Sequence, residues 1–137
     1  METVESNVAC VVHGSQPYRS RQGSLYTPAI SAETVGAQSL FFGIVTIPAG
    51  ERTKAHVHEL HESAFYVLSG ESIELWSGAS LQHRALARAG DYLYIPANVP
   101  HVAVNRGAND AVFVAARNEA TAQESVVMRP ELDHHVP

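Results

Sequence analysis

The sequence contains a single cysteine, Cys10, which excludes an intrachain disulfide and a cysteine-based zinc cluster. Because Cys10 lies in a short apolar run, residues 8–12, we expect its thiol to be buried and inert. Basic residues are also scarce: there are nine in 137 residues, Lys54 is the only lysine, and the formal net charge is -5. This balance argues against sequence-independent nucleic-acid binding, which requires a basic face.

Long hydrophobic runs are missing as well. Residues 8–12 are too short for the apolar region of a signal peptide or for a membrane span, so we expect a cytoplasmic protein without membrane contacts. With 45% hydrophobic and 17% charged residues, the composition is too apolar for a disordered chain. A chain of this length predicts one domain.

No apolar stripe of helical period extends beyond two turns. Short apolar runs of strand length recur instead, and each ends at glycine, proline or asparagine. The expected strands are residues 40–47, 64–68, 72–76, 92–95, 101–104 and 111–116. Many short strands separated by turn residues predict an all-β sandwich or barrel.

Histidine is the enriched residue, with eight copies, and three of them lie close together between Gly50 and Ser63. His56 and His58 are two residues apart, so on a strand both imidazoles lie on one face about 7 Å apart along the chain. Two neutral imidazoles on one strand face can share a metal ion if other strands supply further ligands. A lone pair of this kind is also compatible with two ordinary exposed histidines.

A second segment adds weight to the metal interpretation. It consists of a strand, a tight turn at Pro96 and Asn98, and His101 at the start of the next strand. Asn98 tolerates a left-handed backbone better than most residues, which suits such a turn.

Together the two segments resemble the two motifs of the cupin superfamily, in particular small single-domain bacterial RmlC-like cupins. The matching positions are Gly50, His56, His58, Glu62 and Gly70 in the first motif and Gly90, Pro96, His101 and Asn105 in the second. The resemblance implies a double-stranded β-helix, or jelly-roll, and a homodimer. It divides the chain into an N-terminal arm with edge strands (1–38), a cupin barrel (39–117) and a C-terminal tail (118–137) that we expect to be a surface arm.

The resemblance also implies one divalent transition metal ion per chain, either Mn, Fe, Ni, Zn or Cu. The ligands carried over by position are His56, His58, Glu62 and His101.

The carboxylate position is ambiguous because seven residues, rather than the usual six, separate Glu62 from Gly70. Counting back from Gly70 by six places Ser63 there, and one residue of slip would turn Glu62 away from the metal. A β-bulge near residues 62–64 would restore Glu62, which we favour, and His61 is the alternative fourth ligand.

The remaining side chains are given simpler roles. Phe65, Val67, Leu93 and Ile95 are expected in the core, whereas Tyr66, Tyr92 and Tyr94 lie on the opposite strand faces and suit a dimer interface. His13, His83, His134 and His135 are expected at the surface.

The function implied is a metal-binding cupin that acts on or binds a small molecule, as an oxidoreductase such as a dioxygenase. The alternatives are a non-catalytic cupin that senses a small molecule or a metal, and a cupin isomerase or lyase. Catalytic residues are not identified at this stage.

Overall fold

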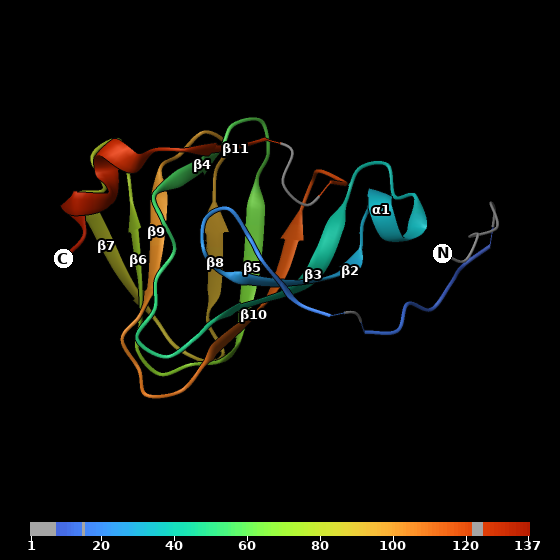
Figure 1. Ribbon diagram of the computed structural model, residues 1–137, viewed down its shortest axis with the longest axis horizontal. Helices are drawn as coiled ribbons and strands as arrows, with labels where there is room; N and C mark the ends of the chain where they lie inside the picture. The colour runs from blue at the N-terminus through green and yellow to red at the C-terminus, as the bar shows by residue number, and fades with distance from the viewer. Residues whose placement is uncertain (1–7, 15, 122–124) are drawn as a thin grey trace.

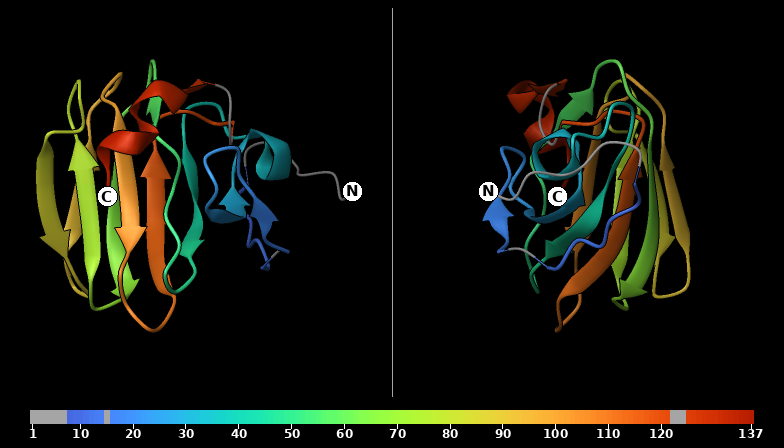
Figure 2. Two further views of the ribbon diagram at one scale, coloured as in Figure 1. Left: turned by 60° about the vertical axis from the view of Figure 1, so that its left-hand side comes forward. Right: turned by 90° about the vertical axis from the view of Figure 1, so that its right-hand side faces the viewer.

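Two antiparallel sheets stacked against each other form most of the computed structural model, which describes residues 8–14, 16–121 and 125–137 (Figure 1). The two sheets face each other across the core (Figure 2). The arrangement confirms the expected all-β jelly-roll architecture.

The larger sheet has six strands among the described residues. In spatial order they are β1 (Tyr18–Arg19), β2 (Leu25–Ile30), β3 (Phe41–Ile47), β10 (Ala111–Arg117), β5 (Ser63–Ser69) and β8 (Tyr92–Ile95). Burial alternates strictly along β3 and β10, so one face of each strand points into the barrel.

The smaller sheet has five strands among the described residues. In spatial order they are β11 (Val126–Met128), β4 (His56–His58), β9 (His101–Asn105), β6 (Ile73–Ser77) and β7 (His83–Ala87). The central strand β9 pairs with β4 on one side and β6 on the other, which places His101 on β9 beside the strand that carries His56 and His58.

The core between the sheets is built from alternate residues of the larger sheet and a few from the smaller one. Its buried members are Tyr26, Phe41, Val45, Ile47, Val67, Ile73, Ala87, Ala111, Phe113 and Ala115, with Phe65 and Leu93 packed against them. The expectation that Phe65, Val67, Leu93 and Ile95 face inward is confirmed. Tyr66, Tyr92 and Tyr94 are exposed on the opposite face, also as expected.

Two short helices flank the sheets. Helix α1 (Ala32–Val35) begins with a capping box between Ser31 and Thr34 and ends at Gly36 in a left-handed conformation. The 3₁₀ helix η1 (Pro130–His135) lies near the end of the chain. Neither described helix is long and apolar enough to cross a membrane.

The C-terminal tail is part of the packed structure, which corrects the expectation of a surface arm. Strand β11 pairs with β4, and Leu132 and Val136 are buried in a second apolar cluster that includes Val102 and Val104 of β9. The physical reason is that β9 carries apolar side chains on both faces, so its outward face needs a cover.

The expectation for Cys10 was also wrong, because its thiol is exposed. Residues 8–12 form no strand and join neither sheet, and Val8 and Val11 beside Cys10 are exposed too. An apolar run of five residues predicts burial only where a sheet or helix face receives it.

Candidate metal centre

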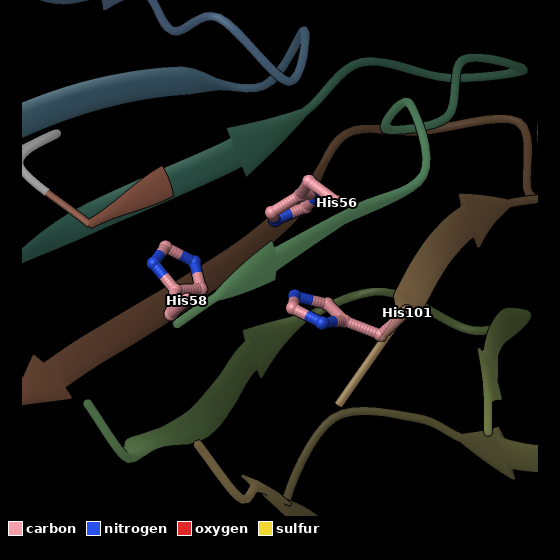
Figure 3. A group of neighbouring side chains, drawn as sticks. All are labelled: His56, His58 and His101. Carbon is pink, nitrogen blue, oxygen red and sulfur yellow. The ribbon is translucent and has the colours of Figure 1, made fainter. Parts of the chain in front are cut away.

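Three buried histidines converge on one point inside the barrel (Figure 3). His56 and His58 project from the same face of β4, and His101 is the direct cross-strand partner of His56 on β9. Their side chains are nearly inaccessible, with 3%, 3% and 4% of each residue exposed. One nitrogen from each ring lies within 4.8 Å of the others, which is compact enough for a single ion to bridge all three.

Backbone carbonyls orient two of the three rings. Nδ1 of His56 lies 2.6 Å from the carbonyl oxygen of Lys54, and Nδ1 of His101 lies 2.9 Å from that of Val99. A carbonyl oxygen can only accept, so each Nδ1 carries a proton and each Nε2 keeps a lone pair. This hydrogen-bonding arrangement is typical of histidines that bind metals.

The third ring, that of His58, has no hydrogen-bond partner for its buried Nδ1 among the described residues. A buried polar nitrogen without a partner is uncommon and costs about 1–3 kcal/mol of stability. The turn after β8 lies against this residue: the amide of Asn98 donates to the His58 carbonyl oxygen at 2.8 Å. Asn98 adopts the left-handed conformation expected for it, with φ at 61°.

All three imidazoles are neutral at neutral pH. Burial lowers the pKa of His56 well below its usual value, and the neighbouring His101 lowers it further. Burial and the same neighbour lower the pKa of His58 to about 3, while burial lowers that of His101 to about 4. The neutral form is the one that donates a lone pair to a metal ion.

A cavity of about 50 Å³ adjoins the three rings. At about 10–15 Å³ for each water, this volume holds roughly three to five water molecules or a ligand of similar size. Apolar side chains of both sheets form most of its wall, and the polar groups other than the histidines are Gln22, Ser24, Tyr26 and Thr53. No Asp or Glu lines it among the described residues.

Glu62, the expected fourth ligand, is not brought to this group in the structure. Its side chain is exposed, and its carboxylate accepts a hydrogen bond from the hydroxyl of Tyr94 on the outer face of the sheet. Ser63 is the residue that turns inward, with 3% exposed, although it does not line the cavity.

The cause is the position of the β-bulge. We expected it near residues 62–64, but β5 pairs regularly from Ser63 onward with both β8 and β10. The register between β5 and β10 shifts instead where Phe113 faces Val67 and Val112 faces Ser69, which leaves Leu68 without a partner. The extra residue is therefore absorbed at Leu68, too late in the strand to turn Glu62 inward.

His61, the alternative fourth ligand, lies outside the group as well. Its Nδ1 is 3.1 Å from Oε2 of the buried Glu119 and also contacts the hydroxyl of Ser125. The other histidines of the described chain, His13, His83, His134 and His135, are exposed, as expected.

Gln22, Ser24 and Tyr26 were not singled out by sequence reasoning, yet all three line the cavity. They belong to residues 1–38, which were expected to form an N-terminal arm with edge strands, but no residue there was assigned to the site. The run Leu25–Ile30 has strand-forming residues, but Pro28 within it weakens that signal.

Comparison with known proteins places this geometry in a family. Residues 43–117, a range that contains both histidine-bearing strands, match the Cupin domain family. The chain belongs to the cupin domain family. A protein of Streptomyces cyaneus named polyketide synthase CurC is 33% identical over 99 residues, and the match spans 72% of this chain but only 61% of CurC. An uncharacterized protein of Methanocaldococcus jannaschii is 24% identical over 92 residues, 67% of this cupin and 70% of the other chain.

Solved structures support the fold. Oxalate decarboxylase of Bacillus subtilis, studied for its Mn(II) centres, superimposes with a TM-score of 0.68 at 22% identity, covering 83% of this cupin and 30% of that chain. A double-stranded β-helix protein of Klebsiella pneumoniae gives a TM-score of 0.66 at 19% identity and covers 92% and 93% of the two chains. This cupin therefore corresponds to less than a third of the decarboxylase and to nearly the whole of the Klebsiella protein.

Proposed function

We propose that this cupin binds one divalent transition metal ion through His56, His58 and His101. The observation that carries the proposal is the convergence of three buried, neutral imidazoles, two of them oriented through Nδ1 so that Nε2 is free. The unpaired Nδ1 of His58 agrees with a ring held for a purpose other than local hydrogen bonding. The donor set is all nitrogen, which suits Fe, Ni, Zn or Cu, whereas Mn would need additional oxygen ligands from water or a bound molecule.

We further propose that the bound ion serves a reaction on a small molecule in the cavity, with oxidoreductase or dioxygenase chemistry as the favoured class. When bound, the ion would supply Lewis acidity and open coordination positions. Three protein ligands leave such positions free, and the cavity beside the rings offers room for a small ligand.

Isomerase and lyase chemistry receives less support from the cavity wall. Those reactions commonly need a side chain that removes a proton, and a carboxylate is a usual choice. Among the described lining residues there is no carboxylate, and the three imidazoles are assigned to the ion. Bacillus subtilis oxalate decarboxylase, with its Mn(II) centres, is a distant relative in fold and supports metal binding rather than a particular substrate.

Metal analysis of the purified protein tests the central proposal. We expect about one equivalent of ion per chain after incubation with Mn, Fe, Ni, Zn or Cu, and its loss in His56→Ala and His101→Ala. The matched control is His83→Ala, because His83 is exposed on β7 and should not affect binding. Full occupancy in both inward variants would refute the assignment of the site.

Enzyme and sensor are separated by turnover. A metal-loaded enzyme should consume dioxygen with one of a panel of small organic acids that fit the cavity of about 50 Å³, and the two inward histidine variants should be inactive. Ligand binding without turnover across that panel would favour the non-catalytic sensing cupin.

We also propose that the protein is a homodimer joined through the outer face of the six-stranded sheet. Six large apolar side chains are between 36% and 78% exposed on this face and its rim: Leu40, Phe42, Tyr66, Leu68, Tyr92 and Tyr94. At about 200 Å² for each large side chain, they expose roughly 600 Å². That area is at the upper limit for a monomer surface and approaches the roughly 800 Å² that each partner buries in a stable complex. Tyrosine-rich apolar patches suit such contacts, and in this one the Tyr94 hydroxyl is hydrogen-bonded to the exposed Glu62.

A further inference from the structure

Tyr26 lines the same cavity as the three histidines, and so does Gln22, which donates a hydrogen bond to the Tyr26 hydroxyl. Tyr26 lies on β2, opposite Val45 of β3, and only 5% of it is exposed. The rings of Tyr18 and Phe41 pack at 5.8 and 6.0 Å from its own ring centroid. The side chain is thus held in place by its neighbours, and its direction does not depend on a ligand.

The oxygen of this hydroxyl accepts a hydrogen bond, and within residues 8–14, 16–121 and 125–137 no hydrogen bond from its proton is found. Nε2 of the buried Gln22 donates to this oxygen at 2.7 Å. Burial raises the pKa of Tyr26, and the nearby Arg117 guanidinium opposes this only in part, so the group is a neutral phenol at neutral pH. Among the described residues no acceptor faces its proton, which leaves the cavity as the place where one can bind.

Charge balance indicates the kind of acceptor. Three neutral imidazoles would leave the two positive charges of a divalent ion uncompensated, because Glu62 lies outside the site. The two buried carboxylates described do not line the cavity: Glu119 is engaged by His61 at 3.1 Å and lies 4.0 Å from Arg117, and Glu74 pairs with Arg84 at 2.7 Å. An uncompensated charge in a largely apolar cavity is costly, and an anionic ligand removes that cost.

We propose that Tyr26 determines ligand specificity by donating a hydrogen bond to a small anion, of the size of acetate, bound in the cavity against the three histidines. The cavity volume of about 50 Å³ sets the size, the ion sets the charge, and the fixed hydroxyl sets where the acceptor atom must lie. This inference rests on the proposed function, because the metal ion supplies the positive charge.

The test uses Co(II) as the ion and sodium acetate as the probe. Co(II) affinity is measured first, by competition with a chelator, for the unaltered protein and for Tyr26→Phe. Acetate is then titrated into the Co(II)-loaded proteins, and binding is followed by the change in visible Co(II) absorption. We expect equal Co(II) affinities and an acetate Kd about tenfold or more higher in Tyr26→Phe, as is usual for the loss of a hydrogen bond to a charged group.

Two controls separate the parts of the argument. Tyr94→Phe removes a hydroxyl that lies outside the cavity, and it should leave both affinities unchanged. Acetamide, which has the shape of acetate without its charge, should bind the unaltered protein much more weakly.

Each outcome has a distinct meaning. Equal acetate affinities in the unaltered protein and Tyr26→Phe would overturn the role of Tyr26 while leaving the metal site intact. Acetamide binding as tightly as acetate would overturn the anionic nature of the ligand. Failure of the unaltered protein to bind Co(II) or any of Mn, Fe, Ni, Zn and Cu would overturn the proposed function itself, and this inference with it.

Discussion

Acid should destabilise the metal-free protein well above the pH range in which carboxylates titrate. His58 and His101 have pKa values lowered to about 3 and about 4, and burial lowers that of His56 as well. In the unfolded chain each would titrate near 6.5. Between these values the unfolded state binds protons that the folded state does not, so stability is present at neutral pH and is lost as pH falls.

The magnitude follows from the distance between the working pH and the unfolded pKa. Between pH 7 and about pH 5, each histidine that stays neutral in the folded protein lowers the free energy of unfolding by roughly 2 kcal/mol. Three of them cost on the order of 6 kcal/mol, which is comparable to the whole stability of a typical domain, roughly 5–15 kcal/mol. The Arg84 guanidinium lowers the pKa of Glu74 to about 2. The contribution of Glu74 to stability is therefore lost mainly below pH 5, outside the pH range compared here.

Urea unfolding of chelator-treated protein at pH 7 and about pH 5 measures this difference. We expect a much lower midpoint at the acidic pH, and a smaller difference in His101→Gln, which removes one of the three buried imidazoles. His83→Gln, an exposed histidine, should behave like the unaltered protein. Equal midpoints at the two pH values would refute the conclusion that the three rings are held neutral by burial.

Four further predictions address the rest of the structure. Glu62→Gln should leave metal affinity within about twofold of the unaltered protein in the same chelator competition, and a large loss would return Glu62 to the ligand set. Gly43→Ala should lower the free energy of unfolding, measured with urea, by about 1–3 kcal/mol, since an added Cβ would lie 2.7 Å from the Thr27 carbonyl oxygen. Leu132→Ala should cost about 2–5 kcal/mol in thermal unfolding because it empties the contact between η1 and β9, and an unchanged midpoint would mean that the tail is not part of the folded unit. Tyr92→Lys should convert a dimer to a monomer in size-exclusion chromatography with light scattering, whereas an unaltered protein that is itself monomeric would refute the dimer.

The histidine positions could be predicted because they depend on local geometry. Side chains two residues apart on a strand share a face, and this alone aligns His56 with His58. The position of His101 depends on the tight turn before it, which Asn98 permits in its left-handed conformation. These relations hold over a few residues, whereas the approach of His101 to His56 depends on the pairing of β4 with β9 and was expected only from the resemblance to cupins.

The parts that were missed depend on contacts between distant segments. The strand that carries Tyr26 belongs to the barrel because it pairs with β3, and the tail is buried because β9 is apolar on both faces. The sequence around Pro28 does not reveal that β2 pairs with β3. The sequence of the short tail, which has few apolar residues, does not reveal that the tail is buried. Cys10 illustrates the reverse error, because an apolar run gives no burial where no sheet receives it.

The position of one bulge has the widest consequence for the site. Strand β5 contains one residue more than the usual spacing, and a bulge can absorb it at any point between Glu62 and Gly70. Absorbed near Glu62, it would have added a carboxylate and reduced the charge of a metal-loaded site by one. Absorbed at Leu68, it leaves Glu62 outside and three neutral ligands inside. Under the proposed metal binding, the charge that the protein does not neutralise would be neutralised by the bound ligand, so the proposal links the register of one strand to the charge of that ligand.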